Sequence, residues 1–243
     1  MQSPRLVIRL SFALSLGVAS SSAQLHVNLF NDSHVPVDIV AEAQREVDRI
    51  YESAKVRISW RECPIFGEGA VICFTTLRPA IDVRLYGASE ERRFRLKRHT
   101  FGFAMSEPDR EKYYAVIFPG RVAKTASESD IRYGRLLGYV IAHEIGHVLL
   151  TEGRAHAVTG LMKTPWQAKE LDDIKRGTMT FLPAQTALFH ETIARKFRAG
   201  DLVANASNPR SGSAVKDEKH SSGEKKDIAS ESPQKRRQNF RRR

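Results

Sequence analysis

The run His143-Glu144-Ile145-Gly146-His147 contains the residue types of a metal-dependent hydrolytic site. If this stretch is a helix, its two histidines stand one turn apart on the same face, close enough for both imidazoles to hold one zinc ion. A catalytic zinc site keeps one position open for water, and a carboxylate beside the metal serves as general base. The motif therefore predicts a zinc site with His143 and His147 as ligands and Glu144 as the catalytic base.

The residues around this motif favour a buried helix. Residues 136–142 and 148–150 are almost all apolar. Burying two histidines and a glutamate without a partner would be costly. The apolar setting therefore favours a metal site over a chance occurrence of the pattern.

A catalytic zinc needs a third protein ligand, and the next histidine along the chain is His156. Gly153 lies before it and can take the left-handed conformation that ends a helix, which would let His156 approach the metal from another direction. Met162 follows six residues after His156 and is expected in the core.

These motifs resemble the signature of the metzincin clan of zinc peptidases, H-E-x-x-H-x-x-G-x-x-H followed by a methionine turn beneath the metal. The chain departs from it, since Leu150 stands at the glycine position and Gly153 at that of the third histidine. The G-x-x-H unit follows three residues later, at 153–156, which predicts an active-site helix about one turn longer. Residues 138–166 are also similar to small secreted bacterial proteins, predicted peptidases, that share an H-E-[IL]-G-H-x-L-L core and a G-[IL]-M turn.

The resemblance implies a zincin-like α+β fold, in which a mixed twisted sheet packs on the active-site helix and a smaller helical C-terminal part follows. It implies a zinc metalloendopeptidase acting on peptide or protein substrates. His143, His147 and His156 would bind zinc, and Met162 would be the methionine of the turn. The gluzincin class instead takes a glutamate from a downstream helix, which would make Glu170, on the helix expected after Trp166, the alternative third ligand, with Asp172 and Asp173 as nearby competitors.

Hydrophobic periodicity supports this fold class. Alternating residues predict strands over 25–30, 56–60 and 81–86, and helical spacing predicts a helix over 37–51. Two more strands are expected over 100–105 and 113–118. In zinc peptidases of the kind that the chain resembles, an edge strand above the metal pairs with an extended substrate, and Gly102 would permit close backbone approach. The alternative is an ordinary hairpin in the sheet. Helices are expected over 167–176 and 183–197.

The N-terminal residues have the features of a secretory signal peptide. Arg5 and Arg9 precede an apolar stretch at 10–19, and small residues occupy 21–23. We expect cleavage near Ala23 and a secreted or periplasmic protein. No later apolar run approaches membrane-spanning length.

The chain has two cysteines, Cys63 and Cys73. In an oxidising compartment such a pair most often forms one disulfide. A bridge across this short loop would raise the free energy of unfolding by about 2–3 kcal/mol, chiefly by reducing the conformational entropy of the unfolded chain.

The C-terminal residues differ in composition from the rest of the chain. Residues 204–243 contain eleven Lys or Arg and five Asp or Glu, and this surplus is more than half of the net charge of +11. Because residues 203–243 include almost no large apolar side chains, we expect them to form a disordered basic tail. The folded domain is then expected over residues 24–202. The tail could hold the protein on an anionic surface. A nucleic-acid partner is disfavoured, because no aromatic interleaving or binding motif accompanies the charge.

The leading hypothesis is an exported zinc metallopeptidase. One alternative is a secreted binding or adhesion protein on a zincin scaffold, which Glu144 disfavours, since a decayed site would be expected to lose its base. The other alternative is a zinc amidohydrolase that acts on a non-peptide amide. Such an enzyme would use the same zinc chemistry and would differ from a peptidase only in the shape of its pocket.

Overall fold

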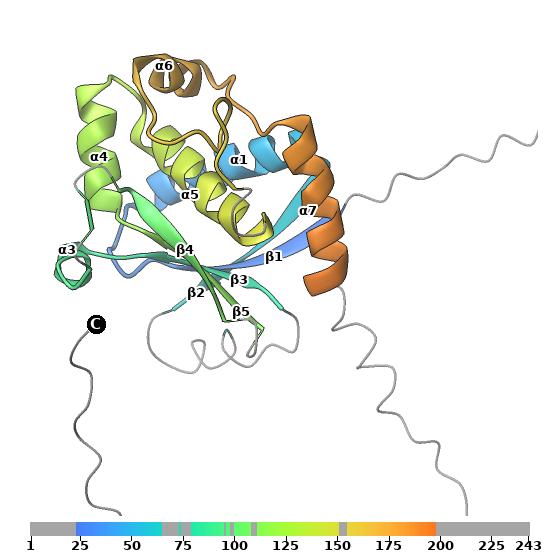
Figure 1. Cartoon of the computed structure of the whole chain (residues 1–243). Helices are drawn as coiled ribbons and strands as arrows, with labels where there is room; N and C mark the ends of the chain where they lie inside the picture. The colour runs from blue at the N-terminus through green and yellow to red at the C-terminus, as the bar shows by residue number, and fades with distance from the viewer. Residues whose placement is uncertain are drawn as a thin grey trace, which may run out of the picture. The chain divides into compact units, whose positions relative to one another are not determined.

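The computed structural model describes residues 23–64, 73, 79–94, 96–97, 100–107, 111–150 and 155–197, which form a mixed sheet with helices packed on it (Figure 1). The expected signal peptide, except Ala23, and the expected tail lie outside the described residues. Within the described part, no helix is long and apolar enough to cross a bilayer.

The sheet has five strands in the order β2-β1-β3-β5-β4. They are β1 (Ala23–Phe30), β2 (Val56–Cys63), β3 (Ile81–Leu85), β4 (Gly102–Glu107) and β5 (Lys112–Ile117). The pairs β1/β2, β1/β3 and β3/β5 are parallel, whereas β4 runs antiparallel to β5 at one edge. Because parallel neighbours need a crossover, helix α1 (Val37–Ser53) joins β1 to β2, which confirms the predicted strand, helix, strand unit.

One face of the sheet is covered by helices. The side chains of Ile81, Val83 and Leu85 alternate along β3 and are fully buried. Helices α1 and α5 (Tyr133–Leu149) pack against each other above the strands (Figure 1). The core therefore lies between the sheet and α5, the helix that carries the histidine motif.

The remaining helices are α3 (Ala88–Glu91), α4 (Pro119–Glu128), α6 (Ala168–Arg176) and α7 (Pro183–Lys196). The last two match the expected ranges, whereas α3 and α4 were not predicted. Gly177 caps the C-terminal end of α6, and its φ of +74° is the left-handed conformation that glycine adopts readily. A mixed sheet with a helical C-terminal part confirms the expected α+β class.

The predicted extra turn of the active-site helix is wrong. Helix α5 ends at Leu149, and Leu150 is already extended, with φ −94° and ψ 130°. The apolar run stops at Leu150, so a further turn would bury nothing apolar. Gly153, which was expected to end the helix, lies outside the described residues.

Candidate metal centre

Helix α5 is fixed by close contact with α1. A Cβ at Gly138 would lie 2.6 Å from the carbonyl oxygen of Ala43, so only glycine allows the two backbones to approach so closely. One turn further along, the fully buried Tyr51 of α1 donates its hydroxyl hydrogen to the carbonyl of Ala142, at 3.0 Å. The contacts with α1 thus set the position of the next residue, His143.

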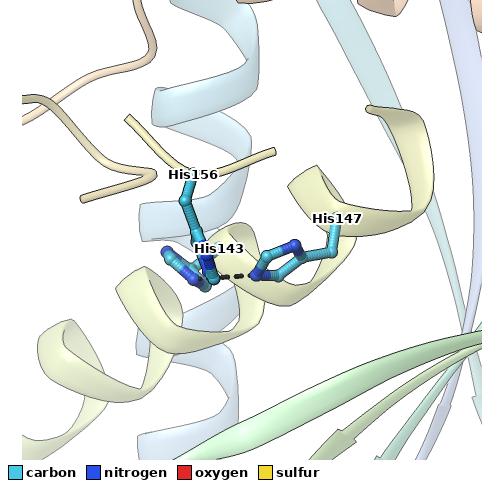
Figure 2. A group of neighbouring side chains, drawn as sticks. All are labelled: His143, His147 and His156. Atoms are coloured by element: carbon cyan, nitrogen blue, oxygen red, sulfur yellow. Dashed lines mark hydrogen bonds between the residues drawn. The ribbon is translucent and has the colours of Figure 1, made fainter. Parts of the chain in front are cut away.

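The two helix histidines face each other across one turn. The Nε2 atoms of His143 and His147 are 3.1 Å apart, and Figure 2 shows both rings on the same side of the helix. His143 is buried and His147 partly buried. Helical geometry has therefore brought two ring nitrogens to one point, as two ligands of a single ion require.

His156 joins the two helix histidines from a separate segment of the chain (Figure 2). Its ring centroid lies 4.7 Å from that of His147 and 5.9 Å from that of His143. One ring nitrogen from each histidine can be chosen so that all three lie within 4.8 Å of one another, an arrangement that could hold a metal ion. His156 is exposed, so the group is open to solvent on its side.

The turn at 160–162 packs against α5 and contacts His143 and Gly146. The Nδ1 atom of His143 lies 2.8 Å from the carbonyl oxygen of Leu161, which fixes Nδ1 as the protonated nitrogen and makes Nε2, which faces His147, the acceptor. Met162 is fully buried, and a Cβ at Gly146 would lie 2.7 Å from its sulfur. Gly160, at φ +76°, allows the turn that brings these two residues under the helix.

The helix histidines are neutral at neutral pH. Burial lowers the pKa of His143 to about 4. The pKa of His147 is lowered to about 3, first by burial and then by the neighbouring His143 and His156. A neutral imidazole has the lone pair that a metal ligand needs, so both side chains are in the binding-competent form without competition from protons.

The carboxyl group of Glu144 is buried beside the histidines. Burial raises its pKa to about 8. Its Oε2 atom is buried and has no hydrogen-bond partner among the described residues. A buried acceptor without a partner is costly, and a cation close by would favour the charged carboxylate and lower its pKa.

These observations fit a zinc site. Three imidazoles, one with its tautomer set by a backbone carbonyl, match the ligand type and number of a catalytic zinc centre. The Glu144 carboxylate, whose buried Oε2 has no partner among the described residues, is the kind of group that a nearby cation stabilises. His143, His147 and His156 are therefore the residues that would hold the metal.

A cleft of about 940 Å³ opens over the histidines and Glu144. The edge strand β4 forms one wall, and residues 163–166 form part of another. A Cβ at Gly102 would lie 2.4 Å from the carbonyl oxygen of Val116 and 3.1 Å from Oε1 of Glu144, so glycine lets β4 pass directly beside this carboxylate. The edge strand and the candidate base thus line the same cavity.

Glu170, the alternative third ligand, makes other contacts. Its Oε1 accepts a hydrogen bond from Nζ of Lys163 at 2.6 Å, and its Oε2 accepts one from the backbone N–H of Gln167 at 3.0 Å, which caps α6. Among the described residues, the group that could hold a metal consists of the three histidines and does not include it. The structure places His156, and not Glu170, beside the helix histidines.

The disulfide between Cys63 and Cys73 is confirmed, with a Cα–Cα distance of 6.0 Å. Both cysteines pack with Phe30 in a small cluster separate from the main core, and neither lines the cleft. The bridge therefore contributes to the fold and not to the site.

Two contributors to the site were not recognised from the sequence. Leu161 acts through its backbone carbonyl, which any residue would supply, so the sequence contains no signal for it. Gln185 of α7 donates through Nε2 to the carbonyl of Ala155, the residue before His156. A lone glutamine near a helix start gives no hint of a contact 30 residues away.

No protein-family model and no curated protein matches this sequence. Among solved structures, the chain is similar to an archaemetzincin from Methanopyrus kandleri, with 16% sequence identity and a TM-score of 0.42, over 73% of this chain and 100% of that chain. It is also similar to metalloproteinase-II from Bacteroides fragilis, with 14% identity and a TM-score of 0.40, over 70% of this chain and 53% of that chain. Both likenesses are weak, so the functional argument rests on the residues of the site.

Proposed function

We propose that this protein is an exported zinc metallopeptidase that cleaves within peptide or protein chains. The observation that carries the proposal is the convergence of three histidine rings beside the buried carboxyl group of Glu144, whose Oε2 has no hydrogen-bond partner among the described residues. A metal-binding protein without turnover would have no need of that carboxylate. Its position in the cleft supports a hydrolytic role.

His143, His147 and His156 would hold the zinc ion through their ring nitrogens. Zinc supplies Lewis-acid chemistry, which polarises a carbonyl group and makes water acidic near neutral pH. Glu144 accepts a proton from the attacking water at its carboxylate and then donates it to the nitrogen of the departing amine. The Leu161 carbonyl keeps His143 in the tautomer that presents Nε2.

The shape of the cleft supports an extended peptide as substrate. Strand β4 lies at the edge of the sheet and lines the cleft along most of its length. A peptide added to this edge would be held by main-chain hydrogen bonds, which tolerate many side chains. Because glycine at position 102 brings the strand next to Glu144, such a peptide would pass the candidate base.

Export is supported by the disulfide, because such bridges persist in oxidising compartments. Cleavage after Ala23 would remove the first residue of β1 and leave the rest of the strand. N-terminal sequencing of the protein recovered from the secreted or periplasmic fraction should therefore give Gln24. A mature chain that still begins at Met1 would refute cleavage.

The zinc site is tested by metal analysis of the purified mature protein. We expect about one zinc per chain in the wild type, loss of zinc in His143→Ala and in His156→Ala, and retention in the matched control Glu170→Gln. A wild-type protein of normal stability that binds no zinc would refute the site. Retention in His156→Ala with loss in Glu170→Gln would reassign the third ligand.

Catalysis is tested with the substitution Glu144→Gln, which keeps the size of the side chain and removes its basicity. We expect this variant to bind zinc like the wild type and to have lost cleavage of a peptide library. Equal cleavage by both proteins would refute the role of Glu144. If the zinc-loaded wild type cleaves no peptide, the result would favour a binding protein or an amidohydrolase of non-peptide amides.

A further inference from the structure

The segment at the start of α7, residues 180–185, contacts both pieces of chain that flank the candidate metal centre. The carbonyl of Thr180 accepts a hydrogen bond from the N–H of Leu161, at 2.9 Å, and Leu161 in turn holds His143. The Nε2 atom of Gln185 donates to the carbonyl of Ala155, at 3.4 Å. Residues 180–185 thus hydrogen-bond to Leu161, the partner of His143, and to Ala155, the chain neighbour of His156.

The amide of Gln185 has a fixed orientation. Its Oε1 atom accepts a hydrogen bond from the N–H of Leu182, at 3.0 Å, and a backbone N–H can only donate. The NH₂ group must therefore point the other way, toward the carbonyl of Ala155. Because Gln185 is only 5% exposed, losing that carbonyl would leave a buried donor without a partner.

His156 depends on its chain neighbours for its position. It is exposed, so no packed core holds its ring. On one side, the N–H of Ala157 donates to the carbonyl of Met162, at 3.1 Å, and on the other the carbonyl of Ala155 accepts from Gln185. The first of these bonds joins main chain to main chain, whereas the second comes from a single replaceable side chain.

We propose that Gln185 is a positioning residue for His156 and that it couples the docking of α7 to metal binding. The inference rests on the zinc site proposed above. Removing a group that hydrogen-bonds a metal ligand directly typically lowers metal affinity 10–100-fold, and for Gln185, which acts one residue from His156, we expect an effect near the lower end of this range. Coupling between two equilibria is reciprocal, so bound zinc should also stabilise the start of α7.

The first experiment measures the zinc dissociation constant by competition with a chelator. Gln185→Glu keeps the oxygen that accepts from Leu182 and loses the donor, and Gln185→Met, of similar length, loses both. Ile193→Val is the control, because this fully buried residue of α7 contributes to packing alone. We expect a roughly 10-fold or larger rise of the dissociation constant for either Gln185 variant and less than about a two-fold change for Ile193→Val.

The second experiment follows amide hydrogen exchange in the wild-type protein, so it does not depend on any variant folding. Added zinc should slow the exchange of amides at the start of α7 more than that of amides in α4, which in the described part of the chain makes no hydrogen bond to residues 155–162. Equal slowing in the two helices would overturn the coupling.

The outcomes separate this inference from the proposed function. If the wild type binds no zinc, both are overturned. If the wild type binds zinc and the Gln185 variants bind it equally well, only the positioning role is overturned. If Ile193→Val weakens binding as much as the Gln185 variants do, Gln185 acts through general stability, and the inference also fails.

Discussion

Replacing Gly138 with alanine tests how strongly the direct contact between α5 and α1 constrains the fold. The added Cβ would lie 2.6 Å from the carbonyl oxygen of Ala43 and 2.7 Å from the Cβ of Glu46. Carbon atoms in good contact are about 3.5–4.0 Å apart. Neither neighbour can rotate away, because one is backbone and the other is attached to it, so the helices must separate by up to about 1 Å.

The expected loss of stability follows from two opposing effects. Overpacking of a core contact costs about 1–3 kcal/mol. Alanine is better than glycine in a helix by about 1 kcal/mol. Because the clash involves backbone, we place the cost in the upper part of its range and expect Gly138→Ala to lower the free energy of unfolding by about 1–2 kcal/mol. Separation would also strain the hydrogen bonds that cross between the two helices, from Arg135 to Glu46 at 2.9 Å and from Arg49 to the hydroxyl of Tyr139 at 2.8 Å.

Gly120 provides a matched control. It lies in α4, and a Cβ there would meet nothing within 4 Å. Gly120→Ala should therefore leave stability unchanged or raise it by up to about 1 kcal/mol. Urea unfolding of the three metal-free proteins, followed by circular dichroism, compares them under one condition. The reasoning is refuted if Gly138→Ala is as stable as Gly120→Ala.

Three further predictions concern the site and the disulfide. Gly102→Ala should reduce peptide cleavage and retain zinc, since its Cβ would intrude on β5 and on Glu144; wild-type cleavage rates in a kinetic assay would contradict this. Cys63→Ser should lower the free energy of unfolding by about 2–3 kcal/mol in urea titrations without changing zinc content. The metal-free protein should be most stable near pH 6.5. Below that, the unfolded chain binds more protons, because the folded pKa values of His143 and His147 are lowered to about 4 and 3. Above it, the folded chain binds more, because the pKa of Glu144 is raised to about 8, so stability falls as pH rises toward 8. Urea unfolding at several pH values checks this, and the fall above pH 6.5 should be absent in Glu144→Gln.

Strands and helices with a clear apolar period were predicted well. Strands expected over 25–30, 56–60 and 81–86 coincide with β1, β2 and β3, because one face of each packs under the helices and enforces alternation. Helix α4 was missed because it buries only Pro119, Val122 and Ala126, too few apolar residues to give a helical period.

The end of α5 shows where a resemblance misled the prediction. The displaced G-x-x-H unit suggested three more helical residues, but the helix ends at Leu149. Helix length is decided by what the next turn can bury, and after Leu150 the sequence offers Thr151, Glu152 and Gly153.

The sequence by itself determined the parts of this protein that depend on local geometry. His143 and His147 meet because residues four apart share a helix face, and the cysteines pair across a short loop. Which of His156 and Glu170 lies beside the helix histidines is visible only in the tertiary structure, which favours His156 as the proposed third ligand. Glu170 is held by the cap of α6, whereas His156 is brought to the helix by contacts with the 160–162 turn and with α7. The contact from Gln185 to Ala155 spans 30 residues, and such contacts depend on how the helices pack, which the spacing of residues along the chain does not reveal.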